Sequence, residues 1–257
     1  MNITISSIYF SPVKSISFQK INKCKIKKNI GIVNDRLFAF SRLLDSEKAQ
    51  KMEQEPSERK LINFLTLKNT PILNKYSFEY NEGNLELFND QKKLISINPN
   101  NPEEVSLIEK EVLNLDDQVK GPVYLLKNNQ NPFFDTNSAG EAMNSISLIN
   151  HNSIKDIEKN MGKEVEHQRF RGNFYINGLD AWEERNWIGK TIKINGMTFK
   201  VDDHIPRCKA TNLKPNSENV TFNLPKKLKE FYGHIDLGVY LIPSENGEVS
   251  IEDKIII

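Results

Sequence analysis

The residue best suited to chemistry in this chain is Cys208, within Val201-Asp-Asp-His-Ile-Pro-Arg-Cys-Lys-Ala-Thr211. Arg207 and Lys209 flank it, and positive charge stabilises the thiolate, the form that ligates metals or attacks electrophiles. The competing interpretation is a small buried side chain, because free cysteines are commonly buried. His204 is left out of the candidate site, since a lone histidine is more often solvated or structurally paired.

A second candidate segment is Gln168-Arg-Phe-Arg-Gly-Asn-Phe174. If it is extended, Arg169 and Arg171 lie on one side of the chain, and with Asn173 they suit a phosphate or another oxyanion. The alternative is a solvated charged face on which these arginines pair with Glu164 or Glu166.

Two further basic segments lie near the N-terminus. Phe10-Ser-Pro-Val-Lys-Ser15 ends an expected strand with a proline turn, where Lys14, Ser15 and backbone amides could cradle a phosphate. Asn34-Asp-Arg36 places Arg36 directly before another expected strand. Alone, the first is an ordinary turn, and Arg36 has an obvious local partner in Asp35.

The bulk composition narrows the function classes. With 35 Lys and Arg against 34 Asp and Glu, the net charge of +1 gives no global field for nucleic acid or an anionic membrane. The chain has no signal-peptide pattern and no long apolar run, so we expect a cytoplasmic protein without a membrane span. The two cysteines, Cys24 and Cys208, cannot by themselves form a four-cysteine iron–sulfur cluster or zinc site.

Short β-branched and aromatic runs with turn residues between them predict mainly strands. We expect strands at residues 3–10, 21–26, 36–41, 64–67, 76–80, 85–88, 93–97, 123–126, 174–176, 191–194, 198–201 and 238–242. Hairpin turns are predicted at residues 81–84, where Gly83 can take positive φ, and at Asn195-Gly196.

The remaining elements are two helices and a loop. Residues 102–113 have amphipathic spacing with Pro102 in the first turn, and residues 154–160 follow Ser153 as N-cap and end before Gly162. The polar stretch 127–144 reads as a long loop of the kind that is often functional. Trp182 and Trp187 are assigned to the core.

The basic segments and the cysteine follow one another in an order that resembles the MOSC domain family with its N-terminal MOSC β-barrel domain. Within it, the chain is most similar to the branch of the mitochondrial amidoxime-reducing component and its bacterial relatives. The segments that carry the resemblance are Ser11-Pro-Val-Lys-Ser15, Asn34-Asp-Arg36, Phe64-Leu-Thr-Leu-Lys-Asn-Thr-Pro71, Arg169-Phe-Arg-Gly-Asn173, and Arg207-Cys208 with Thr211.

The resemblance implies a mainly β fold of β-barrel type with a few helices. It implies an N-terminal MOSC-associated β-rich domain at residues 1–118, packed on a C-terminal MOSC β-barrel domain at residues 119–257. For the wider superfamily, the resemblance also implies pyridoxal phosphate binding.

The resemblance also implies a molybdenum cofactor (molybdopterin) site. Cys208 would be the catalytic residue and metal ligand. The cofactor-binding residues would be Lys14, Ser15, Arg36, Arg171 and Asn173, with Thr211 and Asn150 as lesser candidates.

The implied activity is reduction of a small N-hydroxylated substrate by a molybdenum-cofactor-dependent oxidoreductase. Its electrons would come from a separate electron-transfer protein of reductase, ferredoxin or cytochrome type, because no Gly-rich βαβ fingerprint is evident. Two alternatives stay open: a sulfur carrier or sulfurtransferase using a Cys208 persulfide, and a non-enzymatic carrier of the cofactor.

The chain departs from the family pattern at three positions. Ile205 stands where relatives often have a second cysteine, so a two-cysteine feature is absent. Gly172 replaces a proline, which relaxes the turn. Lys68 stands where relatives tend to carry arginine, which weakens a bidentate phosphate contact there.

Overall fold

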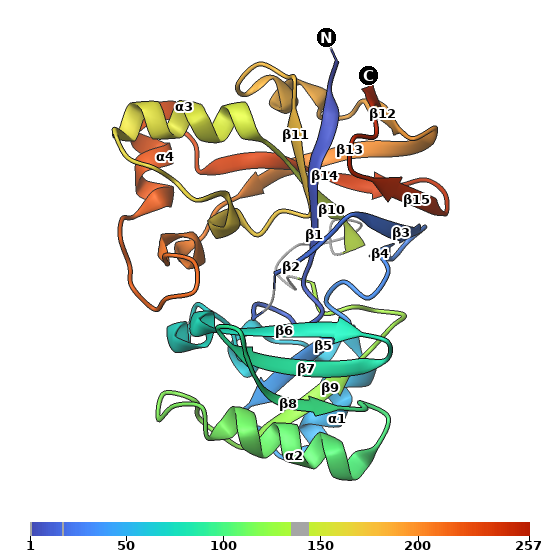
Figure 1. The fold of residues 1–257 in the computed structure, drawn as a ribbon, viewed down its shortest axis with the longest axis vertical. Coiled ribbons are helices and arrows are strands. Elements are labelled where there is room, and N and C mark those ends of the chain that lie inside the picture. The colour runs from blue at the N-terminus through green and yellow to red at the C-terminus, as the bar shows by residue number, and fades with distance from the viewer. Residues whose placement is uncertain (1, 17, 135–143) are drawn as a thin grey trace.

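The structure, a computed structural model, describes residues 2–16, 18–134 and 144–257. Figure 1 shows two lobes, and each has its own apolar core. The upper lobe holds a large sheet and the lower lobe holds two smaller sheets, with helices packed against both. The prediction of a mainly β fold with a few helices is confirmed.

The large sheet has eight strands. Their spatial order is β16 (Ile255–Ile256), β12 (Thr191–Ile194), β13 (Met197–Pro206), β14 (Asp236–Pro243), β10 (Ile146–Asn150), β11 (Phe174–Asn177), β1 (Thr4–Phe10) and β2 (Gln19–Ile21). Only β10 and β11 pair in parallel, and the helix α3 (His151–Met161) lies in the crossover between them, as a parallel pair requires.

The C-terminal residues join the two sides of this sheet. The Ile5 N–H donates to the carbonyl of Asp253 at 3.0 Å, and the Ile255 N–H donates to the carbonyl of Ile3 at 2.9 Å. Since Ile255 also belongs to β16, these bonds connect that edge to β1 and close the sheet on itself.

The upper lobe is completed by a small sheet and a second helix. The sheet consists of β15 (Gly247–Ser250), β3 (Lys23–Lys27) and β4 (Gly31–Ile32), and the helix is α4 (Leu224–Tyr232). Along β3, buried and exposed side chains alternate, so Cys24 and Ile26 enter the core of the large sheet.

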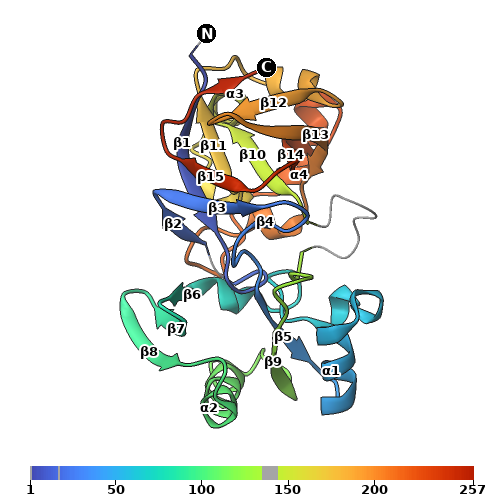
Figure 2. The same cartoon turned by 90° about the vertical axis from the view of Figure 1, so that its right-hand side faces the viewer.

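The lower lobe is formed by residues from the middle of the sequence. Its elements are β5 (Phe38–Arg42) paired with β9 (Val123–Lys127), the antiparallel sheet β6 (Tyr76–Asn81), β7 (Asn84–Asn89) and β8 (Lys92–Ile97), and the helices α1 (Ser46–Gln54) and α2 (Pro102–Leu113). In Figure 2 this lobe lies below the large sheet, with α1 and α2 on opposite sides of β5 and β9.

The lobes do not follow the predicted boundary near residue 118. The chain first builds β1 to β4 in the upper lobe, and residues 3–32 supply core side chains there together with the C-terminal strands. Strand β9, from beyond the boundary, pairs with β5 in the lower lobe. The domain boundary between residues 118 and 119 stays a prediction. Strands from the two sides of this boundary pair with each other in both lobes, β1 with β11 and β5 with β9.

Several local predictions are confirmed. The helix at residues 102–113 is α2, and the hairpins at Asn81–Asn84 and Asn195-Gly196 join the expected strands. Gly83 has φ +86°, as its turn requires. Trp187 is 1% exposed in the core, while Trp182 is partly buried against Tyr232.

Three local predictions are wrong. The N-cap of α3 is Asn150, whose side chain accepts from the Asn152 N–H, so the helix begins earlier than the Ser153 cap implied. Residues 64–67 do not form a strand: Phe64 makes a single bridge to Ser41, and a turn begins at Leu67. The segment around Arg169 is also not extended, as described below.

None of the helices in residues 2–16, 18–134 and 144–257 combines the length and apolar character needed to cross a bilayer. Half of the loop expected at residues 127–144 lies at positions 135–143, outside the described residues.

Candidate functional site

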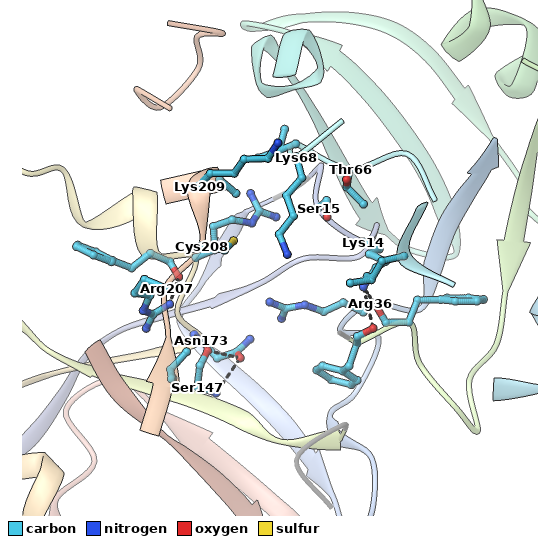
Figure 3. A pocket seen from close by; sticks show the side chains of 18 of the residues that line it. Lys14, Ser15, Arg36, Thr66, Lys68, Ser147, Asn173, Arg207, Cys208 and Lys209 are labelled. Carbon is cyan, nitrogen blue, oxygen red and sulfur yellow. Dashed lines mark hydrogen bonds between the residues drawn. The ribbon is translucent and has the colours of Figure 1, made fainter. Parts of the chain in front are cut away.

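A pocket of ≈ 470 Å³ lies where the two lobes meet. Its wall comes from the turn after β1, the segment before β5, the turn at residues 66–69, the start of β10, the segment before β11, and the residues that follow β13. This volume is within the range of small-molecule and cofactor sites, which often lie between domains. Figure 3 shows side chains from these separate segments directed into the same space.

The pocket wall is strongly cationic. The described lining residues include no Asp or Glu. They include six basic residues: Lys14, Arg36, Lys68, Arg171, Arg207 and Lys209. The chain as a whole has a net charge of +1, so this is a local concentration of charge. Such a wall favours an anionic ligand.

The turn after β1 crosses between the lobes and carries Lys14 and Ser15. The backbone of Lys14 donates to the Phe38 carbonyl at 2.8 Å, and its ammonium donates to the carbonyls of Phe133 at 3.1 Å and Phe134 at 2.7 Å. Ser15 has φ +67°, a left-handed conformation that is uncommon outside glycine. Lys14 therefore fixes the backbone of this wall and also contributes positive charge to the pocket.

Asp35 and Arg36 form an ion pair behind the pocket surface. The Asp35 carboxylate also accepts from the Ser11 N–H at 2.7 Å and from the Asn173 side-chain amide at 3.0 Å. The guanidinium of Arg36 lies 5.5 Å from the Phe134 ring centre. The predicted local partner is thus present, and Arg36 still lines the pocket.

Arg171 is positioned by an abrupt turn. The 3-10 helix η5 (His167–Phe170) ends at Arg171 with φ +52°, and the following Gly172 N–H donates to the Tyr175 hydroxyl at 3.1 Å. That hydroxyl donates in turn to the His167 carbonyl at 2.7 Å, which fixes both sides of the turn.

The electrostatic state of Arg171 reflects the surplus of positive charge. Burial, followed by the neighbouring charge of Arg36, lowers the pKa of Arg171 to about 10. It is still protonated at neutral pH, and a bound anion would relieve the repulsion from Arg36. Its Nη2 atom donates to the Ser11 hydroxyl at 3.2 Å.

Arg169 does not share a face with Arg171, which corrects the expectation of an extended segment. The helical turn sends the Arg169 side chain to Glu166 at 2.6 Å, the Asn212 carbonyl at 3.1 Å and the Thr221 hydroxyl at 2.9 Å. Arg169 therefore pairs with Glu166, as the alternative interpretation expected, but at 4% exposure it is buried and does not lie on a solvated face.

Asn173 lines the pocket, but its side-chain amide is fully engaged by the protein. The nitrogen donates to the Tyr9 carbonyl at 3.1 Å and to Asp35 at 3.0 Å. The oxygen accepts from the Ser147 N–H at 3.1 Å and from its hydroxyl at 2.8 Å. An amide has two N–H donors and two acceptor lone pairs, so this arrangement positions the pocket wall and leaves no group for a ligand.

Cys208 is partly exposed in the pocket, just after β13. Thr211 fixes the backbone of Cys208, since the hydroxyl and the N–H of Thr211 both donate to the Cys208 carbonyl, at 2.8 Å and 3.0 Å. Arg207 is 7% exposed and donates to the carbonyls of Phe170 at 2.9 Å and Leu237 at 3.0 Å. Arg207 thus ties the cysteine segment to the Arg171 turn.

Cys24 provides a contrast to Cys208. It is 5% exposed, and burial followed by the charge of Asp35 raises the pKa of its thiol to about 12. Both cysteines are free. No cluster of three or more His, Cys, Asp or Glu side chains in the described residues could hold a metal.

Six of the predicted residues meet at this pocket: Lys14, Ser15, Arg36, Arg171, Asn173 and Cys208. Thr211 lies behind its wall. Asn150 lies outside it: fully buried, it caps α3 and donates to Glu184 at 3.0 Å and to the Asp180 carbonyl at 2.7 Å. Those contacts account for Asn150 structurally.

The sequence reasoning missed the part of the wall contributed by β10. Ser147 in β10 and Ser145 directly before the strand line the pocket. The available signal was the run Ser145-Ile-Ser-Leu-Ile-Asn150, a short apolar segment with serines at alternate positions. In a strand, such spacing puts both serines on one face.

Comparison with known proteins adds one assignment. Residues 135–256 match the MOSC domain. The MOSC match spans slightly less than half of the 257 residues and includes the segments of Arg171 and Cys208. The segments of Lys14, Arg36 and Lys68, which also line the pocket, lie before the matched residues.

Two solved structures show low similarity to this chain. The YuaD protein from Bacillus subtilis shares 11% sequence identity over 99% of this chain and 94% of its own, with a TM-score of 0.46. YiiM from Geobacillus stearothermophilus shares 16% identity over 43% of this chain and 52% of its own, with a TM-score of 0.35. No protein with curated function matches the chain.

Proposed function

We propose that the pocket binds a molybdenum cofactor through Cys208, and that the protein reduces N-hydroxylated compounds. The observation that carries the proposal is the composition of the pocket, whose described lining residues include one cysteine, six cations and no acidic side chain. Part of the pocket wall lies within the residues that match the MOSC domain.

The residues present fit this cofactor chemically. Molybdopterin carries a phosphate, which suits cationic side chains, and a soft thiolate suits a thiol-ligated metal. Since the described residues offer no cluster of metal ligands, Cys208 would be the protein's one ligand from this wall.

The proposed roles differ from residue to residue. Arg36 and Arg171 face the phosphate or pterin, and Ser15 offers a hydroxyl beside them. Lys14 and Arg207 supply charge and hold backbone carbonyls, while Asn173 and Thr211 position the wall and the cysteine. When bound, the cofactor supplies the two-electron redox chemistry.

The overall reaction is the conversion of an amidoxime to an amidine. The N–O bond breaks, two electrons and two protons are taken up, and the oxygen leaves as water. A separate electron-transfer protein would supply the two electrons that the reaction consumes.

The two cysteines allow a matched test. Cys208→Ala is expected to lower reduction of benzamidoxime by at least about a hundredfold, as expected for loss of a metal ligand. Cys24→Ala removes a thiol from the core and is expected to retain the molybdenum content of the wild type once folded. Molybdenum is measured by elemental analysis and pterin by fluorescence.

Full reductase activity in pterin-loaded Cys208→Ala would eliminate the thiolate-ligand role. A sulfane adduct on Cys208 by mass spectrometry, together with absence of molybdenum, would replace the proposal with the persulfide carrier. Metal-loaded protein that reduces no N-hydroxylated compound with a competent donor would indicate a cofactor carrier.

A further inference from the structure

Two of the six pocket cations differ from the others in having no hydrogen-bond or ion-pair partner within residues 2–16, 18–134 and 144–257. Lys14, Arg36, Arg171 and Arg207 all contact protein acceptors. No hydrogen bond or ion pair joins the side chain of Lys68 or Lys209 to any residue that the structure describes. Their charge is therefore available to a ligand.

The backbones that carry these lysines are ordered. Lys68 lies in a turn held by the Thr70 N–H, which donates to the Thr66 carbonyl at 2.8 Å, and by the Asn69 side chain, which accepts from the Thr66 N–H at 3.0 Å. Lys209 begins the 3-10 helix η7 (Lys209–Asn212), directly after Cys208. Each lysine thus has an ordered backbone and an ammonium group without a partner in the part of the chain that the structure describes.

The two lysines reach the pocket from opposite lobes. In Figure 3, Lys68 and Lys209 lie on the side of the pocket that carries Cys208, across from Asn173 and Ser147. Both lysines add positive charge to one pocket, and an anion bound between them would offset that charge.

Apolar side chains accompany these lysines. Leu61, Ile62, Phe170 and Ile205 line the same pocket, and Ile62 is 71% exposed although it is large and apolar. Apolar lining with a few placed charges is typical of a site for an organic ligand.

We infer that Lys68 and Lys209 form a substrate subsite that selects N-hydroxylated compounds with an apolar body and a carboxylate. The inference rests on the proposed function for the reacting group. The carboxylate binds between the two ammonium groups, the body lies against the apolar wall, and the N–O group is directed toward Cys208.

The test compares 4-carboxybenzamidoxime with benzamidoxime, which differ in the anionic group. In wild-type protein the ratio of kcat/KM for the carboxylated over the neutral substrate is expected to exceed one. Lys68→Gln and Lys209→Gln should each lower this ratio about tenfold, as for loss of one charged hydrogen bond. Lys163→Gln, which alters an exposed lysine outside the pocket, should leave the ratio unchanged.

A second measurement does not depend on turnover. Calorimetric titration of the loaded protein with 4-carboxybenzamidine and with benzamidine measures product affinity directly. The carboxylated ligand is expected to bind more tightly, and the double variant Lys68→Gln/Lys209→Gln should lose that preference. The preference should also fall with added salt.

The outcomes separate the inference from the proposed function. If neither amidoxime is reduced, the proposed function fails, and the calorimetric preference still tests the subsite. If both are reduced with equal ratios in wild type and variants, the subsite is wrong while the function stands. Loss of molybdenum and pterin from Lys68→Gln would assign that lysine to the cofactor and also overturn the subsite.

Discussion

The hydroxyl of Ser147 donates to the side-chain oxygen of Asn173 at 2.8 Å and accepts from the Asn173 N–H at 2.9 Å. This reciprocal pair joins β10 to the segment before β11 at the floor of the pocket. Since Asn173 also bonds Asp35 and Tyr9, one buried amide links three segments that are remote in sequence.

The engaged amide of Asn173 predicts a stability defect for its replacement. Asn173→Ala leaves Asp35 and the Tyr9 carbonyl each short of a buried donor, so we expect a loss of about 2–4 kcal/mol in the free energy of unfolding. Ser147→Ala should lose less, because it removes one hydroxyl. Urea denaturation measures both, and an Asn173→Ala protein as stable as wild type but lacking cofactor would instead indicate direct binding.

Arg169 and Arg171 are two residues apart, and we expect their variants to behave differently. Arg169→Gln removes bonds to Glu166, Asn212 and Thr221, so the free energy of unfolding should fall by about 2–3 kcal/mol.

Arg171→Gln should instead lower the molybdenum and pterin content with a smaller loss of stability, because the repulsion from Arg36 disappears with it. Elemental analysis and urea denaturation of the same preparations distinguish the two outcomes. Equal cofactor content in both variants would contradict the role proposed for Arg171.

The predictable part of the fold is local in sequence. Asn195-Gly196 and Asn81–Asn84 specify hairpins within a few residues, and residues 102–113 specify α2 by their own spacing. The closure of the large sheet depends on contacts between Ile5 and residues near position 253, which no local pattern encodes.

In the candidate site, too, local patterns in the sequence could be predicted and contacts between distant segments could not. Residue type and order singled out Lys14, Arg36, Arg171 and Cys208 as candidates, and the structure brings them to one pocket. The expected strand alternation of Arg169 and Arg171 is wrong, because residues His167–Phe170 form a 3-10 helix and Arg171 adopts a left-handed conformation that is uncommon for arginine. The engagement of Asn173 depends on partners from distant segments and could not be inferred from its own segment.

Gly172 is required by close packing. A Cβ at this position would lie 2.4 Å from the Cδ1 atom of Ile149 and 3.3 Å from the Cζ atom of Tyr175. Gly172→Ala should therefore lower the free energy of unfolding by about 1–3 kcal/mol through overpacking.

Shortening Ile149 should relieve this contact. Ile149→Ala alone is expected to cost about 2–4 kcal/mol by leaving a cavity, and the double variant should cost less than the sum of the two single changes. Urea denaturation of the four proteins measures the coupling, and strictly additive values would show that the two side chains do not compete for this space.

His151 predicts how the stability of the upper lobe depends on pH. Its ring centre lies 5.6 Å from that of His167 and 5.2 Å from that of Tyr175. Burial, followed by the charges of His167 and Lys155, lowers the pKa of His151 from 6.5 to about 4. The folded protein thus keeps this ring neutral at pH values where the unfolded chain protonates it.

The unfolded state therefore binds more protons between about pH 6.5 and pH 4, so stability should be complete above this window and fall as the pH drops through it. His151→Gln should reduce the loss between pH 7 and pH 4 by about 1 kcal/mol, after allowance for solvent screening of a half-buried group. His204→Gln, outside this cluster, is the matched control. Urea midpoints across the window measure the effect, and an identical slope in His151→Gln and wild type would show that another group controls the acid sensitivity.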